Sequence, residues 1–241
     1  DEQHRFGVKQ RVALSQKGKS PHVLVMSATP IPRTLTMILY GDLDVSVIDE
    51  LPPGRQKIET FYVGEALRER VYHFIKGETD KGRQAYIVCP LAEESDKSEL
   101  KSVMEFAGSL TEKYFKPEDV LFIHGKLKEK AKIMETFAKG EAKILVSTTV
   151  IEVGVDVQSA TIMVIENAER FGLSQLHQLR GRVGRGGGKS YCIMFSEGKS
   201  EVTRERMKTM VKTNDGFKIA EKDLELRGPG DFFGTRQHGL P

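Results

Sequence analysis

Short apolar runs alternate along the chain with longer segments in which apolar residues recur at helical spacing. Val103, Phe106, Ala107, Leu110 and Tyr114 follow that spacing, because residues three, four and seven apart share one face of an α-helix. Strands are predicted at 58–63, 85–89, 120–123, 144–146, 162–165 and 191–195, and helices at 66–75, 103–114, 127–138 and 173–179. This alternation predicts an α/β fold, in which a mostly parallel sheet carries helices on both faces.

The segment before this array has a different pattern. Val23 to Met26 is typical of a short strand, and Pro32 suits the first turn of a helix that runs through Leu39. The stretch 49–55 then carries Pro-Pro-Gly between polar flanks. Such punctuation favours a linker between two domains.

The tail after residue 199 also departs from the βα pattern. Helices are predicted at 204–212 and 217–226, and Arg227-Gly228-Pro229-Gly230 predicts a loop that runs to the end at Pro241. Two helices and a Gly/Pro loop do not extend a βα array. We therefore interpret the tail as an appended helical hairpin with a loop.

Composition limits the possible classes of protein. The 241 residues are 39% hydrophobic and 29% charged, which supports a packed core, and the net charge is only +3, so any nucleic-acid surface must be local. Cys89 and Cys192 lie in apolar runs and are expected to be reduced core residues. No apolar run approaches the roughly 20 residues of a membrane span. The sequence opens on Asp1 without a signal peptide, so we expect a piece of a longer, cytoplasmic protein.

Two small polar motifs precede the linker. In phosphate chemistry an aspartate such as Asp1 holds Mg²⁺, and an adjacent glutamate such as Glu2 can orient and deprotonate the attacking water. Taken alone, however, an Asp-Glu pair favours a solvated charged turn. Ser27 and Thr29 follow the first apolar run and could relay hydrogen bonds from a catalytic carboxylate, or could cap the next helix.

A third motif follows the strand predicted at 144–146. The hydroxyl groups of Thr148 and Thr149 come at its carboxyl end, where they are well placed to hold nucleic-acid phosphates. Gly154 and Asp156 come next, and an aspartate there can reach a ribose hydroxyl or an arginine. An ordinary strand-to-loop turn remains the alternative.

The fourth motif is the run from Gln178 to Gly186. Arg182 and Arg185 are three residues apart, so on a helical turn they would share a face and could clamp a triphosphate. A solvated basic turn is the alternative. The nearby Gly188-Lys189-Ser190 is not the end of a phosphate-binding P-loop, because the position five residues earlier is Val183 rather than glycine.

Taken in order, these motifs resemble motifs II, III, V and VI of superfamily 2 helicases. Motif IV would then lie near Tyr86 to Leu91, and His124-Gly125 matches the short motif that follows it. The tail from Asn214 to Gln237 closely resembles the translocation element of RecG-type DNA helicases. The resemblance covers essentially the whole chain and implies a RecA-like, P-loop-NTPase-like second helicase domain.

On the nucleotide side, the resemblance implies ATP and Mg²⁺ as cofactors. Asp1 would bind the metal ion and Glu2 would activate water. Gln3 and His4 would line the ATP site and link it to the DNA path. The residues that would meet the nucleotide from the second domain are Gly154, Asp156, Gln178, Arg182 and Arg185, with the two arginines stabilising transition-state charge.

On the DNA side, the resemblance implies branched double-stranded DNA as the partner, with a single-strand DNA binding protein as a further candidate. Thr148 and Thr149 would touch the DNA backbone. The residues that would couple the ATP site to the movement of DNA are Ser27, Thr29, Arg206, Arg227 and Gln237.

The resemblance also implies a division of the chain. Residues 1–50 would end a first RecA-like motor domain, 51–57 would be the linker, 58–199 the second RecA-like domain, and 200–241 the hairpin and translocation loop. The P-loop motif is absent from the sequence. The resemblance implies an ATP-dependent helicase for the whole protein. Because the P-loop is missing from these residues, we expect no ATP hydrolysis by them alone.

Three alternatives stay open. The transcription–repair coupling translocase carries the same kind of motor and a similar tail element. A non-catalytic nucleic-acid binding module would also use a Gly-rich arginine run such as 180–188. An RNA helicase of the same superfamily is the third, although the tail argues against it by resemblance.

Overall fold

The structure of the chain is a computed structural model. The structure describes residues 22–24, 26–27, 44–90, 96–124, 127, 129–148 and 157–227.

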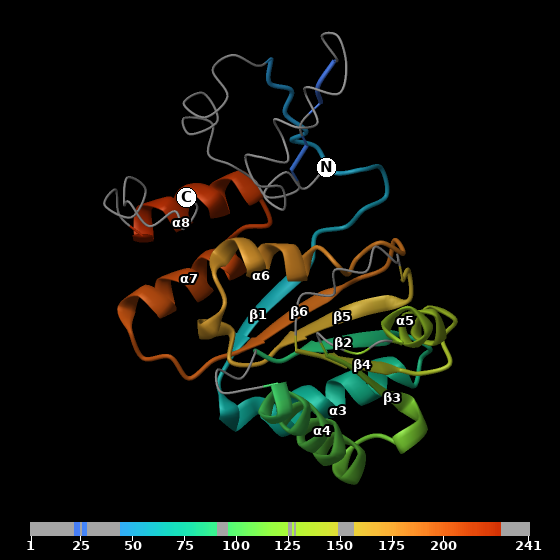
Figure 1. Ribbon diagram of the computed structural model, residues 1–241. Helices are drawn as coiled ribbons and strands as arrows, with labels where there is room; N and C mark the ends of the chain where they lie inside the picture. The colour runs from blue at the N-terminus through green and yellow to red at the C-terminus, as the bar shows by residue number, and fades with distance from the viewer. Residues whose placement is uncertain are drawn as a thin grey trace, which may run out of the picture.

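A parallel sheet forms the centre of the molecule (Figure 1). Its strands are β1 (Glu59–Val63), β2 (Gln84–Val88), β3 (Val120–Ile123), β4 (Ile144–Ser147), β5 (Ala160–Ile165) and β6 (Tyr191–Phe195). They lie in the order β1-β6-β5-β2-β4-β3, and each neighbouring pair is parallel. The strands predicted from residue 58 onward are all confirmed, as is the parallel sheet.

Helices cover both faces of the sheet. They are α3 (Arg68–Thr79), α4 (Asp96–Lys113), α5 (Lys130–Ala138), α6 (Leu173–Arg180), α7 (Glu201–Lys212) and α8 (Gly216–Arg227), with short 3-10 turns at Glu65–Leu67, Pro117–Asp119 and Ala168–Arg170. Figure 1 shows α3 and α4 below the sheet and α6 and α7 above it. Apolar side chains of α5 pack on the same side as α6 and α7.

The two faces give two hydrophobic cores because side chains alternate along each strand. On β2, Tyr86 and Val88 point into the core with α5 and α6, whereas Ala85 and Ile87 point into the core with α3 and α4. All residues of β2 and β5 are buried. These central strands therefore read as continuous apolar runs rather than as alternating ones.

The predicted pair of tail helices is confirmed as α7 and α8. Ser200 caps α7, since its hydroxyl accepts a hydrogen bond from the backbone N–H of Thr203 at 3.1 Å. Met207 and Met210 of α7 and Ile219 of α8 join the core on the α6 side of the sheet. The hairpin is thus packed on the sheet domain through a shared core.

The strand predicted at 23–26 is wrong for the residues described there. Val23, Leu24 and Met26 have 59%, 78% and 47% of their surface exposed and belong to no strand. A short apolar run becomes a strand only where a neighbouring strand takes up its backbone hydrogen bonds. None of the six described strands pairs with this segment.

Both cysteines carry free thiols, as expected. Cys192 is buried and Cys89 is half-buried, and burial raises the pKa of each thiol to about 12. Neither thiol is therefore a reactive thiolate at neutral pH. Across the described ranges, the helices are all too short or too polar to cross a membrane.

Candidate functional site

The arginine motif lies at the amino-terminal edge of the sheet, in residues 181–190 between α6 and β6, here called the arginine loop. Its last residue, Ser190, accepts a hydrogen bond through its carbonyl from the N–H of Glu59 at 2.9 Å, where β1 begins. The loop therefore lies beside the starts of β1, β6 and β5. Arg185 is exposed and Arg182 is half-buried.

The expectation that Arg182 and Arg185 share a helical turn is wrong. Helix α6 ends at Arg180, and Gly184 between the two arginines has φ 81°, a left-handed value that ends any helical continuation. The two side chains are thus set by a turn that Gly184 permits, and their spacing of three residues does not decide their direction.

Glycine lets the arginine loop approach two backbone segments closely. A Cβ on Gly184 would come within 3.2 Å of Ile58, and a Cβ on Gly186 would lie 2.4 Å from the carbonyl oxygen of Gln158. The second distance is too short for any side chain, so only glycine fits there. Gln158 is two residues after Asp156 in the sequence. The loop that carries Arg185 is therefore packed against the chain that follows the third motif.

The predicted linker contacts the arginine loop directly. Pro52 to Arg55 form a tight turn in which the N–H of Arg55 donates to the carbonyl of Pro52 at 3.1 Å and Gly54 has φ 81°. The turn points Arg55 at the loop, where its Nη2 atom donates to the carbonyl of Gly181 at 2.9 Å. This contact joins residues 126 positions apart, so no local sequence pattern indicates it.

Arg180 is a buried clamp between α6 and α7. Its side chain is among the largest fully buried ones, with 1% of its surface exposed. Its Nη1 atom donates to the carbonyls of Met210 and Thr213 at 2.7 and 2.9 Å and to the hydroxyl of Thr60 at 3.3 Å. Met210 lies in the last turn of α7 and Thr213 directly follows the helix, where a cation is favoured by the helix dipole. Arg180 therefore fixes the end of α6 to the end of α7.

His177 completes this cluster as a neutral ring. Its Nδ1 atom lies 3.0 Å from Nη2 of Arg180, and because a guanidinium can only donate, Nδ1 is the acceptor. Burial, reinforced by the charge of Arg180, lowers the pKa of His177 to about 4. Burial also lowers the pKa of Arg180. A charged His177 would place two cations side by side, so the cluster requires a neutral imidazole.

Thr148 lies at the opposite, carboxyl-terminal edge of the sheet. It directly follows β4, and its N–H donates to the carbonyl of Ile123 at 3.4 Å. Its side chain is 2% exposed, so contact with a phosphate would need a different arrangement of its neighbours. The structure thus separates Thr148 from the arginine loop by the length of the strands.

A buried ion pair also lies at the carboxyl-terminal edge. Glu166, which follows β5, accepts hydrogen bonds from Nη1 and Nη2 of Arg68 at 2.9 and 2.8 Å and from the hydroxyl of Tyr72 at 2.9 Å. The Arg68 guanidinium lies 4.3 Å from the centre of the Phe195 ring. Although burial opposes it, hydrogen bonds to Glu166 and Glu65 raise the pKa of Arg68. Helix α3 is thereby attached to the ends of β5 and β6.

The remaining predicted residues divide into three groups. Gln178 is half-buried on α6, and Ser27 is exposed. Arg206 of α7 donates from Nη1 to the carbonyl of Phe171 at 3.3 Å, just before α6, while its buried Nε atom has no partner. Arg227 is the last residue of α8. The predicted site residues that lie outside the described part of the chain are Asp1, Glu2, Gln3, His4, Thr29, Thr149, Gly154, Asp156 and Gln237.

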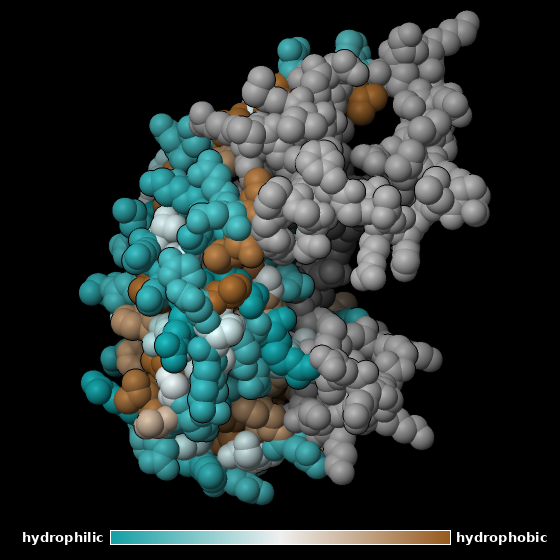
Figure 2. Space-filling view, turned by 90° about the vertical axis from the view of Figure 1, so that its left-hand side faces the viewer, coloured by the Kyte–Doolittle hydropathy of each residue, from teal (hydrophilic) through white to brown (hydrophobic). Residues whose placement is uncertain are grey.

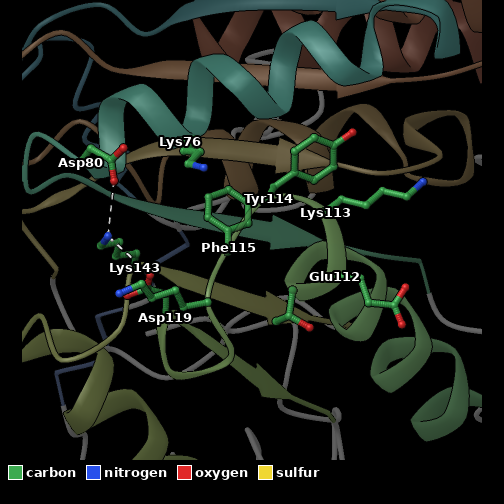
Figure 3. Close-up of a pocket in the computed structure, with 10 residues that line it drawn as sticks. Lys76, Asp80, Glu112, Lys113, Tyr114, Phe115, Asp119 and Lys143 are labelled. Carbon is green, nitrogen blue, oxygen red and sulfur yellow. Dashed lines mark hydrogen bonds and ion pairs between the residues drawn. The ribbon is translucent and has the colours of Figure 1, made fainter.

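A cavity of about 290 Å³ lies away from the arginine loop (Figure 3). Lys143 stands at its rim and pairs with Asp80 and Asp119, each at 3.4 Å. The cavity lies near the starts of β3 and β4, whereas the loop adjoins β1, β6 and β5. Its lysine and aspartate side chains partly pair with one another, so we do not propose it as the nucleotide site that the motifs predict.

The described residues at the surface in Figure 2 are mainly hydrophilic, with hydrophobic residues in small groups. Within the described part of the chain, no group of three or more His, Cys, Asp and Glu residues could hold a metal ion. Asp1, the residue predicted to bind Mg²⁺, lies outside that part.

Comparisons with known proteins identify the relatives of this chain. The family model of the helicase conserved C-terminal domain matches residues 66–187, and that of "ATP-dependent DNA helicase RecG, domain 3, C-terminal" matches residues 213–241. The ATP-dependent DNA helicase RecG of Bacillus subtilis (strain 168) is 56% identical over the whole chain, and that of Synechocystis is 57% identical. The chain covers only 36% and 29% of these two proteins.

Comparison with solved structures points to the same relatives. The structure of RecG bound to a three-way DNA junction matches 96% of this chain and 30% of that one, with a TM-score of 0.78 and 48% identity. The parallel sheet flanked by helices is therefore the RecA-like fold of a second helicase domain. The chain belongs to the helicase conserved C-terminal domain family, and over its whole length it is homologous to part of the RecG helicases.

Proposed function

We propose that this chain is the second motor lobe, with its hairpin, of an ATP-dependent DNA helicase that remodels branched DNA in recombination and repair. The observation that carries the proposal is the arginine loop. Arg182 and Arg185 lie on a turn that is fixed by Gly184, by the close approach of Gly186 to Gln158, and by Arg55. A turn whose backbone is held in place, and which carries two arginines, suits a site that must meet phosphates from another lobe.

In this proposal ATP lies between the two lobes. Arg182 and Arg185 stabilise the charge that develops on the transferred phosphoryl group, and Gln178 contacts the phosphates. Asp1 of the first lobe holds Mg²⁺ and Glu2 activates water, while Gly154 and Asp156 approach the nucleotide. Because the nucleotide is shared between lobes, a single lobe needs no closed cavity at the arginine loop.

The DNA path follows the other edge of the sheet. Thr148 and Thr149, after β4, are proposed to hold the DNA backbone there. Backbone hydrogen bonds continue past the strand ends at this edge. The N–H of Glu166 donates to the carbonyl of Val88 at 2.8 Å, and the N–H of Cys89 donates to the carbonyl of Ser147 at 2.8 Å. Each strand end is thus tied to its neighbour beyond the sheet proper.

The hairpin is proposed to couple the two edges. Arg206, in the middle of α7, donates to the carbonyl of Phe171, two residues before α6, and Arg180 connects the end of α6 to the end of α7. Both ends of α6 are therefore joined to α7 by arginines that donate to carbonyls. Arg227, Gln237, Ser27 and Thr29 are proposed to extend this coupling, with Gln3 and His4 on the first lobe.

One observation favours RecG over the transcription–repair coupling translocase. The RecG-specific family model matches the tail itself, at residues 213–241. The proposed division into a first-lobe remnant (1–50), linker (51–57), second lobe (58–199) and hairpin with loop (200–241) agrees with the linker turn at Pro52 to Arg55. A single-strand DNA binding protein remains a proposed further partner, and the cytoplasm the proposed location.

The test is junction remodelling by the full-length protein that carries this chain. Labelled three-way junctions and linear duplexes of equal length are incubated with the protein, with and without ATP and Mg²⁺. We expect strands to be released from the junction only when ATP and Mg²⁺ are present, and the linear duplex to stay intact. Equal release without ATP, or none from any branched substrate, would refute the proposal.

A further inference from the structure

We propose that Arg55 is a positioning residue that sets the orientation of Arg182 from the linker between the lobes. The inference rests on the proposed function, since it concerns the arginine that meets ATP. It assigns a role to a residue outside the motifs that suggested that function. Arg55 itself contacts the arginine loop and is not proposed to touch the nucleotide.

The contact acts on the peptide group next to Arg182. The Nη2 atom of Arg55 donates to the carbonyl oxygen of Gly181 at 2.9 Å. That carbonyl belongs to the planar peptide unit that also contains the nitrogen of Arg182. Fixing the oxygen fixes the whole plane, so Arg55 restricts the rotation that would swing the Cα atom of Arg182.

The second end of the same peptide is held from inside α6. The N–H of Arg182 donates to the carbonyl of Leu179 at 3.0 Å, and the N–H of Gly181 to that of His177 at 3.0 Å. Both groups of the Gly181–Arg182 peptide are thus bonded, one locally and one by the linker. The linker bond is the one that a movement between lobes would change.

The charge of Arg55 is favoured at this place. Gly181 ends α6, and the carbonyls at the end of a helix carry partial negative charge that attracts a cation. The neutral state of His177 supports the arrangement, and the charge of Arg55 is one of the causes that lower the pKa of His177. A protonated His177 would instead repel Arg55.

The linker turn makes Arg55 a mechanical connection. In the turn from Pro52 to Arg55, Pro52 and Pro53 each fix one backbone torsion, and the N–H of Arg55 closes the turn on the carbonyl of Pro52 at 3.1 Å, which limits the freedom of the turn. A movement of the preceding lobe is therefore passed to Gly181 rather than absorbed by the turn. Arg55 thereby makes the position of Arg182 depend on how the lobes are arranged.

The experiment uses the full-length protein and the variants Arg55→Ala and Lys57→Ala. Lys57 is the matched control, because it is an exposed cation two residues further along the same linker. For Arg55→Ala we expect kcat of junction-stimulated ATP hydrolysis to fall about tenfold, which is 1.36 kcal/mol and typical of one charged hydrogen bond. KM for ATP should stay within about twofold. Lys57→Ala should keep both constants, and an unchanged kcat in Arg55→Ala would overturn the inference.

A double-mutant cycle separates positioning from a general structural effect. If Arg55 acts through Arg182, the double variant Arg55→Ala/Arg182→Ala should hydrolyse ATP at the rate of Arg182→Ala alone. If the two losses multiply instead, Arg55 does not act through Arg182. The hydrolysis rates of the single and double variants are compared per folded molecule, so that a difference in stability does not count as a difference in rate.

A measurement without turnover tests the contact even if the proposed enzyme activity is wrong. Hydrogen–deuterium exchange is followed in the backbone of residues 181–190. We expect exchange there to be at least about threefold faster in Arg55→Ala than in the wild type or in Lys57→Ala. Identical exchange in all three proteins would show that Arg55 does not hold the loop.

Discussion

The guanidinium of Arg180 lies 2.7 Å from the carbonyl oxygen of Met210 and 2.9 Å from that of Thr213. A buried cation that is held by carbonyls at a helix end is costly to desolvate, and here the helix dipole and several hydrogen bonds offset that cost. These hydrogen bonds hold the last residue of α6 in place against α7. The arginine loop begins directly after that residue.

Replacing this side chain should weaken the fold. In Arg180→Met the carbonyls of Met210 and Thr213 lose their donor, and we expect a loss of about 2 kcal/mol in the free energy of unfolding. Urea denaturation of the chain measures it. Arg204→Met on the exposed side of α7 is the control and should leave the midpoint unchanged. Equal midpoints for both variants would contradict the clamp.

The neutral state of His177 predicts a dependence of stability on pH. The pKa of His177 is lowered from its ordinary 6.5 to about 4 in the folded protein, so between these values the unfolded chain binds more protons. The stabilisation is present above the unfolded pKa and is lost as pH falls towards 4. We expect this residue to contribute a loss of up to about 2 kcal/mol between about pH 7.5 and about pH 5.

The variant His177→Gln tests this dependence, because glutamine can accept the hydrogen bond from Arg180 but does not titrate. Urea denaturation at both pH values should show a smaller loss in the variant than in the wild type. If both proteins lose the same stability on acidification, His177 is not the group responsible.

The ion pair of Glu166 and Arg68 predicts an asymmetry between single and double replacement. Glu166→Gln removes the buried partner of Arg68 and leaves it only the exposed Glu65, which we expect to cost about 2 kcal/mol after allowing for the 26% exposure of Arg68. In Glu166→Gln/Arg68→Met the half-buried charge itself is gone, so part of the loss should be recovered. Denaturation of the single and double variants measures both. Glu135→Gln, in an exposed pair, is the control.

The close approach of Gly186 to Gln158 predicts a strict requirement for glycine. In Gly186→Ala the added Cβ would lie 2.4 Å from a backbone oxygen, so the arginine loop must move. We expect ATP hydrolysis by the full-length protein to fall about tenfold or more, since misplacement by about 1 Å can cost about 100-fold. Gly188→Ala is the matched control, because a Cβ there meets nothing within 4 Å. Normal turnover in Gly186→Ala would show that the loop position is unimportant.

The regular part of the fold follows from local pattern. The strands at Val120–Ile123 and Tyr191–Phe195 have the predicted bounds, because a short β-branched and aromatic run between polar turns determines them locally. The run at 23–26 has the same local pattern but no described neighbour to pair with. Pairing depends on residues distant in the sequence, so the pattern alone could not decide it.

The candidate site was predictable in its residues but not in its geometry. Arg182 and Arg185 stood in a recognisable motif, yet the turn at Gly184 that directs them depends on packing against Ile58. The contacts of Arg55 with Gly181 and of Arg68 with Glu166 join residues 126 and 98 positions apart. The only local signals were a polar Glu166 at the end of an apolar strand and an arginine, Arg180, next to a helix end.

The most direct test of the account is the rate of DNA-stimulated ATP hydrolysis by the full-length protein with Arg185→Ala. An arginine that stabilises transition-state charge typically contributes about 10³ or more to the rate. We therefore predict that Arg185→Ala loses hydrolysis by that factor while it binds a three-way junction with nearly wild-type affinity. Wild-type turnover in Arg185→Ala would contradict the proposal that the arginine loop serves an ATP site.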